Sequence, residues 1–296
     1  MATLVRKLQL TLEMIKFEHS VFALPFALTG AMLAFREDRF ATPGLGWKLL
    51  GILVAMVSAR SAAMGFNRLI DADIDGRNPR TSTRHLPAGL LTSSFSWAFV
   101  VVSSLVFLFA AAALNPLCLR LAPVALAVVL VYSYTKRFTS LSHLVLGVAL
   151  GIAPAAAWIA IRASLDWRII WLVAAVMLWT VGFDIIYSCQ DYEFDRREGL
   201  FSIPSRLGVY RALWISRAFH FAMICCLLAL VHAFDLGGLA MTGVAAVAVL
   251  LVWEHRLVKA HDLSRVDAAF FTVNGYVSML FFLFWTADIF LYRSGI

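Results

Sequence analysis

The sequence predicts an all-α, polytopic membrane protein in which nine transmembrane helices form one domain, residues 1–296. Three observations carry this prediction. Hydrophobic residues make up 61% of the chain and charged residues 15%, and the mean hydropathy is +0.83, far above that of a soluble globular protein. The apolar residues gather in runs of about 20, the length that crosses roughly 30 Å of hydrocarbon as a helix. The acidic residues gather at the ends of two such runs.

The apolar runs give the nine spans in order. They lie near residues 17–35, 46–66, 94–114, 117–135, 141–161, 168–188, 212–233, 236–254 and 268–290. The first run follows Arg6 and Lys7, as a signal peptide would, but the eight later spans favour a retained helix. Pro25, Pro123 and Pro154 lie inside spans, where we expect them to kink helices and open space between them.

Basic residues predict the orientation in the membrane. With the N-terminus in the cytoplasm, sixteen Lys and Arg residues fall in inside segments and seven in outside segments, so the positive-inside rule supports this topology. The two longest connections, 67–93 and 189–211, are then cytoplasmic and the C-terminus lies outside. We expect an inner (cytoplasmic) membrane location. The net charge of +7 reflects basic loops beside anionic lipid, and no nucleic-acid partner is expected.

Two acidic stretches share one spacing. The first places Asn67, Asp71 and Asp75 four residues apart, and the second places Tyr187, Asp191 and Asp195 four residues apart, with Asp184 upstream. At about 100° per residue, Asp184, Asp191 and Asp195 fall within roughly 20° of one line on a helix. The shared spacing indicates either an old duplication that gave two half-sites or convergence on the same short pattern.

Carboxylates that share a helix face near a bilayer repel one another and lose hydration, so they need a compensating cation. Mg²⁺ is the natural candidate, because it takes oxygen ligands and binds through a few carboxylates plus the oxygens of a substrate phosphate. The alternative is that the acids lie in solvated loops and form ion pairs with arginines. The candidate partners are Arg68, Arg77, Arg196 and Arg197.

These motifs, together with Tyr134-Thr-Lys-Arg137, resemble the hallmarks of the UbiA superfamily of intramembrane prenyltransferases. The resemblance runs from Lys16-Phe-Glu-His-Ser-Val-Phe-Ala-Leu-Pro25 to the last span. Within the superfamily, the chain is most similar to 4-hydroxybenzoate polyprenyltransferases and to the enzymes that prenylate a naphthoate in the futalosine route to menaquinone. The block from Tyr187 to Pro204 favours the second group, while Gln190 replaces an apolar residue of other branches and leaves the acceptor open.

The resemblance implies a helical fold around a central cavity, capped on the cytoplasmic side and open sideways to lipid. It implies Mg²⁺-dependent transfer from a polyprenyl diphosphate to a ring carbon of a small aromatic acid, in ubiquinone or menaquinone biosynthesis. The implied metal ligands are Asn67, Asp71, Asp75, Asp191 and Asp195. The implied substrate-binding residues are Asn67, Arg68, Arg77, Lys136, Arg137, Asp184 and Arg197.

The chemistry of prenyl transfer fits this residue set. Ionising an allylic diphosphate separates a carbocation from an anion of charge near −3, which metal ions and fixed cationic groups stabilise. Tyr187 is expected to face the carbocation with its ring, and Asp191 is expected to accept the ring proton of the acceptor. Tyr132 and Tyr134 could also face the carbocation. For these two residues, anchoring at the membrane interface is an equal alternative.

Two other functions compete. Intramembrane acids also mark the ion pathways of cation- or proton-coupled transporters, although such sites usually lie near the midplane of the membrane. The Asp71-x-x-x-Asp75-Gly76 spacing also occurs in CDP-alcohol phosphotransferases, but the rest of that motif is absent here. His19, His143 and Asn274 could enter the cavity, but packing roles are expected for all three.

Overall fold

The structure is a computed structural model that describes residues 4–15 and 23–291. His19 and part of the first predicted span, 17–35, lie outside these residues. Within the described chain, eight helices are long and apolar enough to cross a membrane. The sequence predicts nine spans. The difference arises at the first span, whose described part is the 14-residue helix α2 (Leu24–Glu37). The all-α prediction is confirmed, and the chain is a multi-pass membrane protein.

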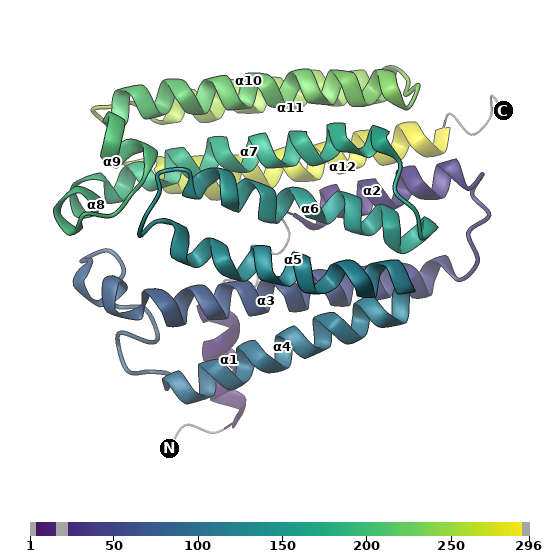
Figure 1. The fold of residues 1–296 in the computed structure, drawn as a ribbon. Coiled ribbons are helices and arrows are strands. Elements are labelled where there is room, and N and C mark those ends of the chain that lie inside the picture. Colours follow the sequence, from purple (N-terminus) through teal and green to yellow (C-terminus); the bar gives the residue numbers. More distant parts are fainter. Residues whose placement is uncertain (1–3, 16–22, 292–296) are drawn as a thin grey trace. The chain divides into compact units, whose positions relative to one another are not determined.

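The helices divide into two compact units. One unit comprises Met1–Ser20 and Leu50–Tyr134, and the other comprises Val21–Leu49 and Thr135–Ile296. The first unit holds α1 (Leu4–Met14), most of α3 (Leu45–Arg77), α4 (Ser93–Leu114) and α5 (Pro116–Thr135). The second unit holds α2, α6 (Ser142–Arg162), α7 (Ile170–Ser188), α8 (Tyr192–Glu198), α9 (Ile203–Leu207), α10 (Val209–Ala233), α11 (Gly238–Leu257) and α12 (Asn274–Leu291) (Figure 1).

Helix α3 extends well beyond its predicted span. It continues from the apolar run through the whole first acidic stretch and ends at Arg77, so the predicted connection 67–93 shortens to 78–92. The prediction ended the span where the hydrophobic run ended, but the backbone meets no proline until Pro79. Asn67, Asp71 and Asp75 therefore lie on a rigid helix rather than in a loop.

In the first unit, the end of α1 packs on the segment that precedes α4. Met14, Ile15 and Leu91 form a buried apolar cluster, and Phe95 and Phe99 of α4 pack against it. The α4 and α5 surfaces carry many exposed apolar side chains, as expected of helices that face lipid.

In the second unit, α7 is the most buried span, because 61% of its most apolar window lies inside the protein. It packs between α6 and α10, while α2 packs on α6 and α12, and α11 packs on α10 and α12. Fully buried aromatic rings fill the centre: Phe26 lies 4.8 Å from Trp179 and 4.6 Å from Phe281, centroid to centroid. In Figure 1, α8 and α9 lie at the end where α7 leads into α10.

Three more short elements shape this unit. The 3-10 turn η3 (Cys189–Asp191) separates α7 from α8, and a second 3-10 turn, η2 (Trp167–Ile169), precedes α7. The π-helical turn η4 (Ala268–Val273) precedes α12. Hydrogen bonds between residues five apart are rare in helices and are often found at functional sites.

Close helix crossings depend on glycine. A Cβ atom at Gly30 of α2 would collide with the backbone carbonyl of Pro154 in α6. Small residues allow such close backbone approaches, which give membrane helices their packing contacts.

We therefore expect Gly30→Ala to lower the free energy of unfolding in detergent by about 1–3 kcal/mol, the usual cost of overpacking. Gly46→Ala is the matched control, because nothing lies within 4 Å of a Cβ placed there. Thermal and denaturant unfolding of both variants would measure the difference. Equal stability of the two would show that the α2–α6 crossing adapts to the extra methyl group.

Candidate active site

The first acidic stretch occupies the last turns of α3. Asp71 and Asp75 are buried, with 2% and 5% of their surface exposed, whereas Asp73 between them is exposed. The Asn67 side-chain amide donates to Asp71 Oδ2 at 3.1 Å, which shows that these two side chains lie on the same helix face. The helical spacing thus places the predicted ligands Asp71 and Asp75 on a buried face and Asp73 on an exposed one.

The loop after α3 supplies a cation to this face. Arg84 Nη1 lies 2.7 Å from both carboxylate oxygens of Asp75. Thr81 Oγ1 donates to the backbone carbonyl of Asp75 at 3.0 Å, which folds the loop back over the helix end. Sequence reasoning proposed Arg68 and Arg77 as the arginine partners and missed Arg84. The short polar loop between Asp75 and Arg84 could have indicated this pair, because a loop of that length can bring Arg84 back to the end of the helix.

The second acidic stretch is not one continuous α-helix. Helix α7 ends at Ser188, and the 3-10 turn η3 separates Tyr187 from Asp195 on α8. A 3-10 turn holds about 3.0 residues rather than 3.6, so it rotates everything that follows relative to an α-helical stripe. The line predicted through Asp184, Asp191 and Asp195 is therefore broken at η3.

Asp195 lies at the centre of this second half-site. The side chains of Asp191, Lys136 and His143 lie within electrostatic range of its carboxylate. Ser202 Oγ donates to Asp195 Oδ2 at 2.9 Å, and Ser202 also begins α9 through a capping box with Ser205. The carboxylate is thus connected to the start of a helix.

Lys136 belongs to the same neighbourhood. Its backbone carbonyl accepts a hydrogen bond of 2.8 Å from the amide of Phe201, one residue before the Ser202 cap. Of the predicted substrate contacts, the structure therefore brings Lys136 together with Asp195. Both groups belong to the second unit.

His143 connects three helices in this half-site. Its Nδ1 lies 2.6 Å from Asp184 Oδ2 of α7, and its Nε2 lies 3.2 Å from the backbone amide of Ile203 in α9. Because Nε2 accepts the Ile203 N–H, the ring proton resides on Nδ1 and is donated to the carboxylate. His143 is buried, as expected of a packing residue, but its contacts fix Asp184. The predicted substrate-binding role of Asp184 stays a prediction.

The partly exposed ring of Tyr187 packs against two phenylalanine rings. Its ring centroid lies 4.2 Å from that of Phe270 and 6.2 Å from that of Phe271, both on the π-helical turn η4. Gln190 Nε2 donates to Asp267, next to the same turn, at 3.4 Å. The segment from Tyr187 to Gln190 is therefore held against the start of α12.

The arginines after Asp191 contact aromatic rings. Arg196 Nη1 donates to the Tyr192 hydroxyl at 3.0 Å, and Arg197 lies 5.9 Å from the centroid of the Phe194 ring. Both arginine side chains are exposed. The alternative that they neutralise Asp191 stays open, and so does the predicted substrate contact of Arg197.

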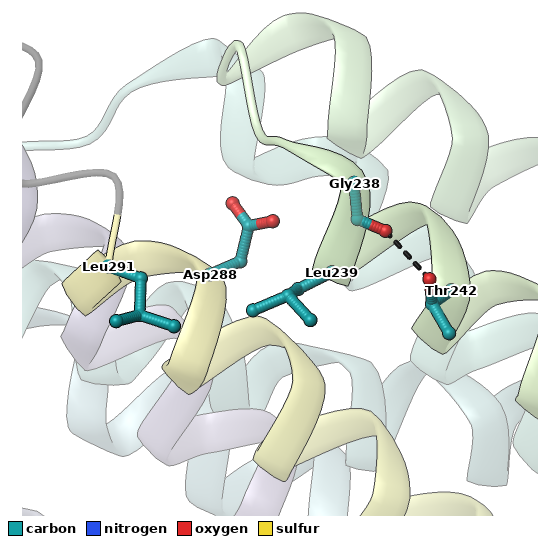
Figure 2. A pocket seen from close by; sticks show the side chains of 5 residues that line it. All are labelled: Gly238, Leu239, Thr242, Asp288 and Leu291. Atoms are coloured by element: carbon teal, nitrogen blue, oxygen red, sulfur yellow. Dashed lines mark hydrogen bonds between the residues drawn. The ribbon is translucent and has the colours of Figure 1, made fainter.

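A surface pocket lies at the opposite end of the second unit, where α11 begins and α12 ends (Figure 2). Its lining residues are Gly238, Leu239, Thr242, Asp288 and Leu291. The Asp288 carboxylate accepts the amides of Gly237 and Ala240 at 2.8 and 2.9 Å. It caps the N-terminus of α11, where a negative charge is favourable. We assign this pocket a structural role, because none of the predicted site residues lines it.

The donor atoms of the two half-sites fit Mg²⁺. They are carboxylate and amide oxygens, the ligands that a hard divalent cation takes. Both ring nitrogens of the nearby His143 already have hydrogen-bond partners. Among the described residues, no three His, Cys, Asp or Glu side chains form a ready-made metal cluster, so the ligand set stays a prediction.

We expect His143→Ala to lower the free energy of unfolding by about 1–3 kcal/mol, because Asp184 and the Ile203 amide lose a buried partner. Trypsin should then cleave faster at Arg196, Arg197 and Arg206. His143→Gln is the matched control, because its side-chain amide can donate to Asp184 and accept from Ile203. If alanine and wild-type proteins unfold and cleave alike, His143 does not hold this half-site together.

Comparison with known proteins identifies the family and the fold. Residues 23–286 match the UbiA prenyltransferase family. The 4-hydroxybenzoate octaprenyltransferase of Vibrio atlanticus (strain LGP32) is 29% identical over 243 residues, which cover 80% of this chain and 84% of that relative.

Two solved structures share the fold. The apo structure of a UbiA homolog from Aeropyrum pernix K1 has a TM-score of 0.81 and 35% identity, covering 93% of this chain and 98% of that one. A UbiA homolog from Archaeoglobus fulgidus bound to GPP and Mg²⁺ has a TM-score of 0.73 and 21% identity, covering 95% and 99%. The resemblance drawn from the sequence motifs is confirmed: the chain belongs to the UbiA prenyltransferase family and is a membrane-embedded prenyltransferase.

Proposed function

We propose that this enzyme transfers a polyprenyl group from a polyprenyl diphosphate to a ring carbon of a small aromatic acid, with Mg²⁺ as cofactor. The acceptor is 4-hydroxybenzoate or a dihydroxynaphthoate, for ubiquinone or menaquinone biosynthesis. The observation that carries the proposal is the pair of oxygen-rich half-sites, each beside basic side chains, in an apolar multi-pass chain. The name of the Vibrio relative and the GPP and Mg²⁺ bound to the Archaeoglobus homolog support it.

Each half-site supplies part of the diphosphate chemistry. Asn67, Asp71, Asp75, Asp191 and Asp195 would hold Mg²⁺. The bound ion would neutralise the charge that builds on the diphosphate as its bond to carbon breaks. Arg68, Arg77, Lys136, Arg137 and Arg197 would donate to the phosphate oxygens, beside Asn67 and Asp184. We propose that the two units work as one enzyme domain, because neither half-site alone carries the full set of acids.

The transfer step needs a shielded carbocation and a proton acceptor. The bond between the allylic carbon and the diphosphate oxygen breaks, and its electron pair leaves with the diphosphate. A ring carbon of the acceptor then forms a bond to the allylic carbon and loses its proton. Tyr187 would face the cation with its ring, and Asp191 would accept the proton.

We propose a location in the cytoplasmic membrane, with the N-terminus and both acidic stretches on the cytoplasmic side and the C-terminus outside. The distribution of Lys and Arg residues supports this orientation. The hydrocarbon substrate explains why the enzyme is embedded in lipid, because the long prenyl tail partitions there.

The first experiment tests donor, acceptor and metal together. Purified enzyme in detergent is incubated with Mg²⁺, a short prenyl diphosphate, and either 4-hydroxybenzoate or a dihydroxynaphthoate. We expect one of the two acceptors to give a product in which a prenyl group replaces one ring hydrogen, detected by its mass. We also expect turnover to be lost in excess chelator. A transporter would give no product in detergent, where no sealed membrane exists. Failure with every acceptor would reject the proposed function, and full turnover in chelator would reject the metal.

The second experiment concerns one proposed ligand. Asp191→Asn should lower turnover by at least about a hundredfold, the usual scale for removing a group that stabilises the transition state. The thermal stability of the metal-free variant, measured in chelator, should equal that of the wild type or be slightly higher, because one of several neighbouring negative charges is removed. Glu193→Gln is the matched control, since this acid is exposed two residues away. A destabilised Asp191→Asn enzyme that stays active would assign Asp191 a structural role instead.

A further inference from the structure

Three buried polar side chains join α7, α11 and α12 of the second unit. Trp179, Glu254 and Asn274 each have at most 1% of their surface exposed. Trp179 Nε1 donates to Asn274 Oδ1 at 2.7 Å, and Asn274 Nδ2 donates to Glu254 Oε1 at 2.9 Å. His220 Nδ1 lies 3.5 Å from the other carboxylate oxygen of Glu254. Buried polar groups in an apolar bundle are costly unless they are satisfied, so this network needs a reason.

The orientation of the Asn274 amide follows from its partners. An indole nitrogen can only donate, so the Asn274 oxygen must face Trp179. The NH₂ group is then directed toward Glu254 and toward the preceding turn. Asn274 thus presents its donors where the backbone needs them.

That turn is the π-helical turn η4, and Asn274 follows it directly. Asn274 Nδ2 lies 3.2 Å from the carbonyl oxygen of Ala269 and 3.1 Å from that of Phe270. A π-turn inserts one residue into the helical ladder and leaves carbonyls without their regular donor. The side chain of Asn274 supplies such a donor, which stabilises the turn.

The turn positions two aromatic rings beside Tyr187. Phe270 lies 4.2 Å from Tyr187 and 5.3 Å from Phe183, and Phe271 lies 4.7 Å from Phe270, centroid to centroid. Tyr187, Phe270 and Phe271 are partly exposed, unlike the fully buried rings at the centre of the unit. Tyr187 also lies four residues before Asp191.

We propose that Asn274, held by Trp179 and Glu254, is a positioning residue that fixes the π-turn so that Phe270 and Phe271 complete an aromatic wall around Tyr187. The wall shields the allylic cation from water. This inference rests on the proposed function and deepens it. Ring faces stabilise a cation without attacking it, and apolar edges exclude the competing nucleophile.

Shielding has a direct chemical readout. The cation is captured either by the aromatic acceptor or by water. In the second case, water bonds to the allylic carbon and loses a proton, which gives the prenyl alcohol. The molar ratio of prenyl alcohol to prenylated acceptor therefore measures how well the wall excludes water, and a general loss of folded enzyme lowers both products without changing their ratio.

The experiment compares five enzymes with a short prenyl diphosphate, Mg²⁺ and the accepted aromatic acid. Asn274→Ala and Phe270→Leu should each raise the alcohol-to-product ratio at least about threefold, in line with the strength of a single cation–π contact. Glu254→Gln should keep the wild-type ratio, because its side-chain oxygen still accepts from Asn274. Asp288→Asn is the matched control, since Asp288 also joins α12 to α11 but does so at the far end of both helices.

The outcomes separate the inference from the proposed function. If Asn274→Ala does not insert stably, Phe270→Leu tests the same wall with the network intact. Unchanged ratios in an active Phe270→Leu enzyme, or a ratio that rises equally in Asp288→Asn, would overturn the inference alone. A wild-type enzyme that prenylates no acceptor would overturn the proposed function and the inference with it.

Discussion

An ionised carboxylate cannot remain buried in an apolar helix bundle without a partner, and this constraint governs the acids of the protein. Three buried or partly buried acids meet it in different ways. Arg84 reaches Asp75 from a loop, the neutral ring of His143 donates to Asp184, and the N-terminus of α11 accommodates Asp288. The partners come from distant segments, so they also determine where loops and short helices lie. The contacts that neutralise these acids are therefore also contacts that hold the local fold.

The constraint gives the second unit two different ends. At one end, Lys136 and His143 lie near Asp195 of α8, which Ser202 connects to the start of α9. At the other end, the acidic side chain of Asp288 is occupied by backbone amides of the α10–α11 turn. The π-turn η4 and helix α12 connect both ends, since Asp267 before η4 contacts Gln190 and α12 carries the Asp288 cap. The proposed site lies at the first end, where acidic and basic side chains occur together.

Much of this could be predicted from the sequence, for physical reasons. Hydrophobic runs of span length specify membrane helices, and four-residue spacing specifies a helix face, as the Asn67–Asp71 hydrogen bond shows. The partners could not be predicted in the same way. Arg84 and His143 meet their acids through a loop return and a helix crossing, which depend on tertiary packing. The π-turn before Asn274 was also missed, because its sequence reads as ordinary apolar helix.

The two half-sites share a spacing but are not equivalent. In the first, a straight helix keeps Asn67 in hydrogen-bond contact with Asp71. In the second, the 3-10 turn η3 separates Tyr187 from the acids, and the tyrosine packs on Phe270 instead. If both stretches descend from one ancestor, the change of one turn from α-helical to 3-10 geometry accompanied the replacement of a polar residue by an aromatic one at the first position of the motif. Under the proposed function this division is useful, because anion binding needs polar donors and cation shielding needs apolar rings.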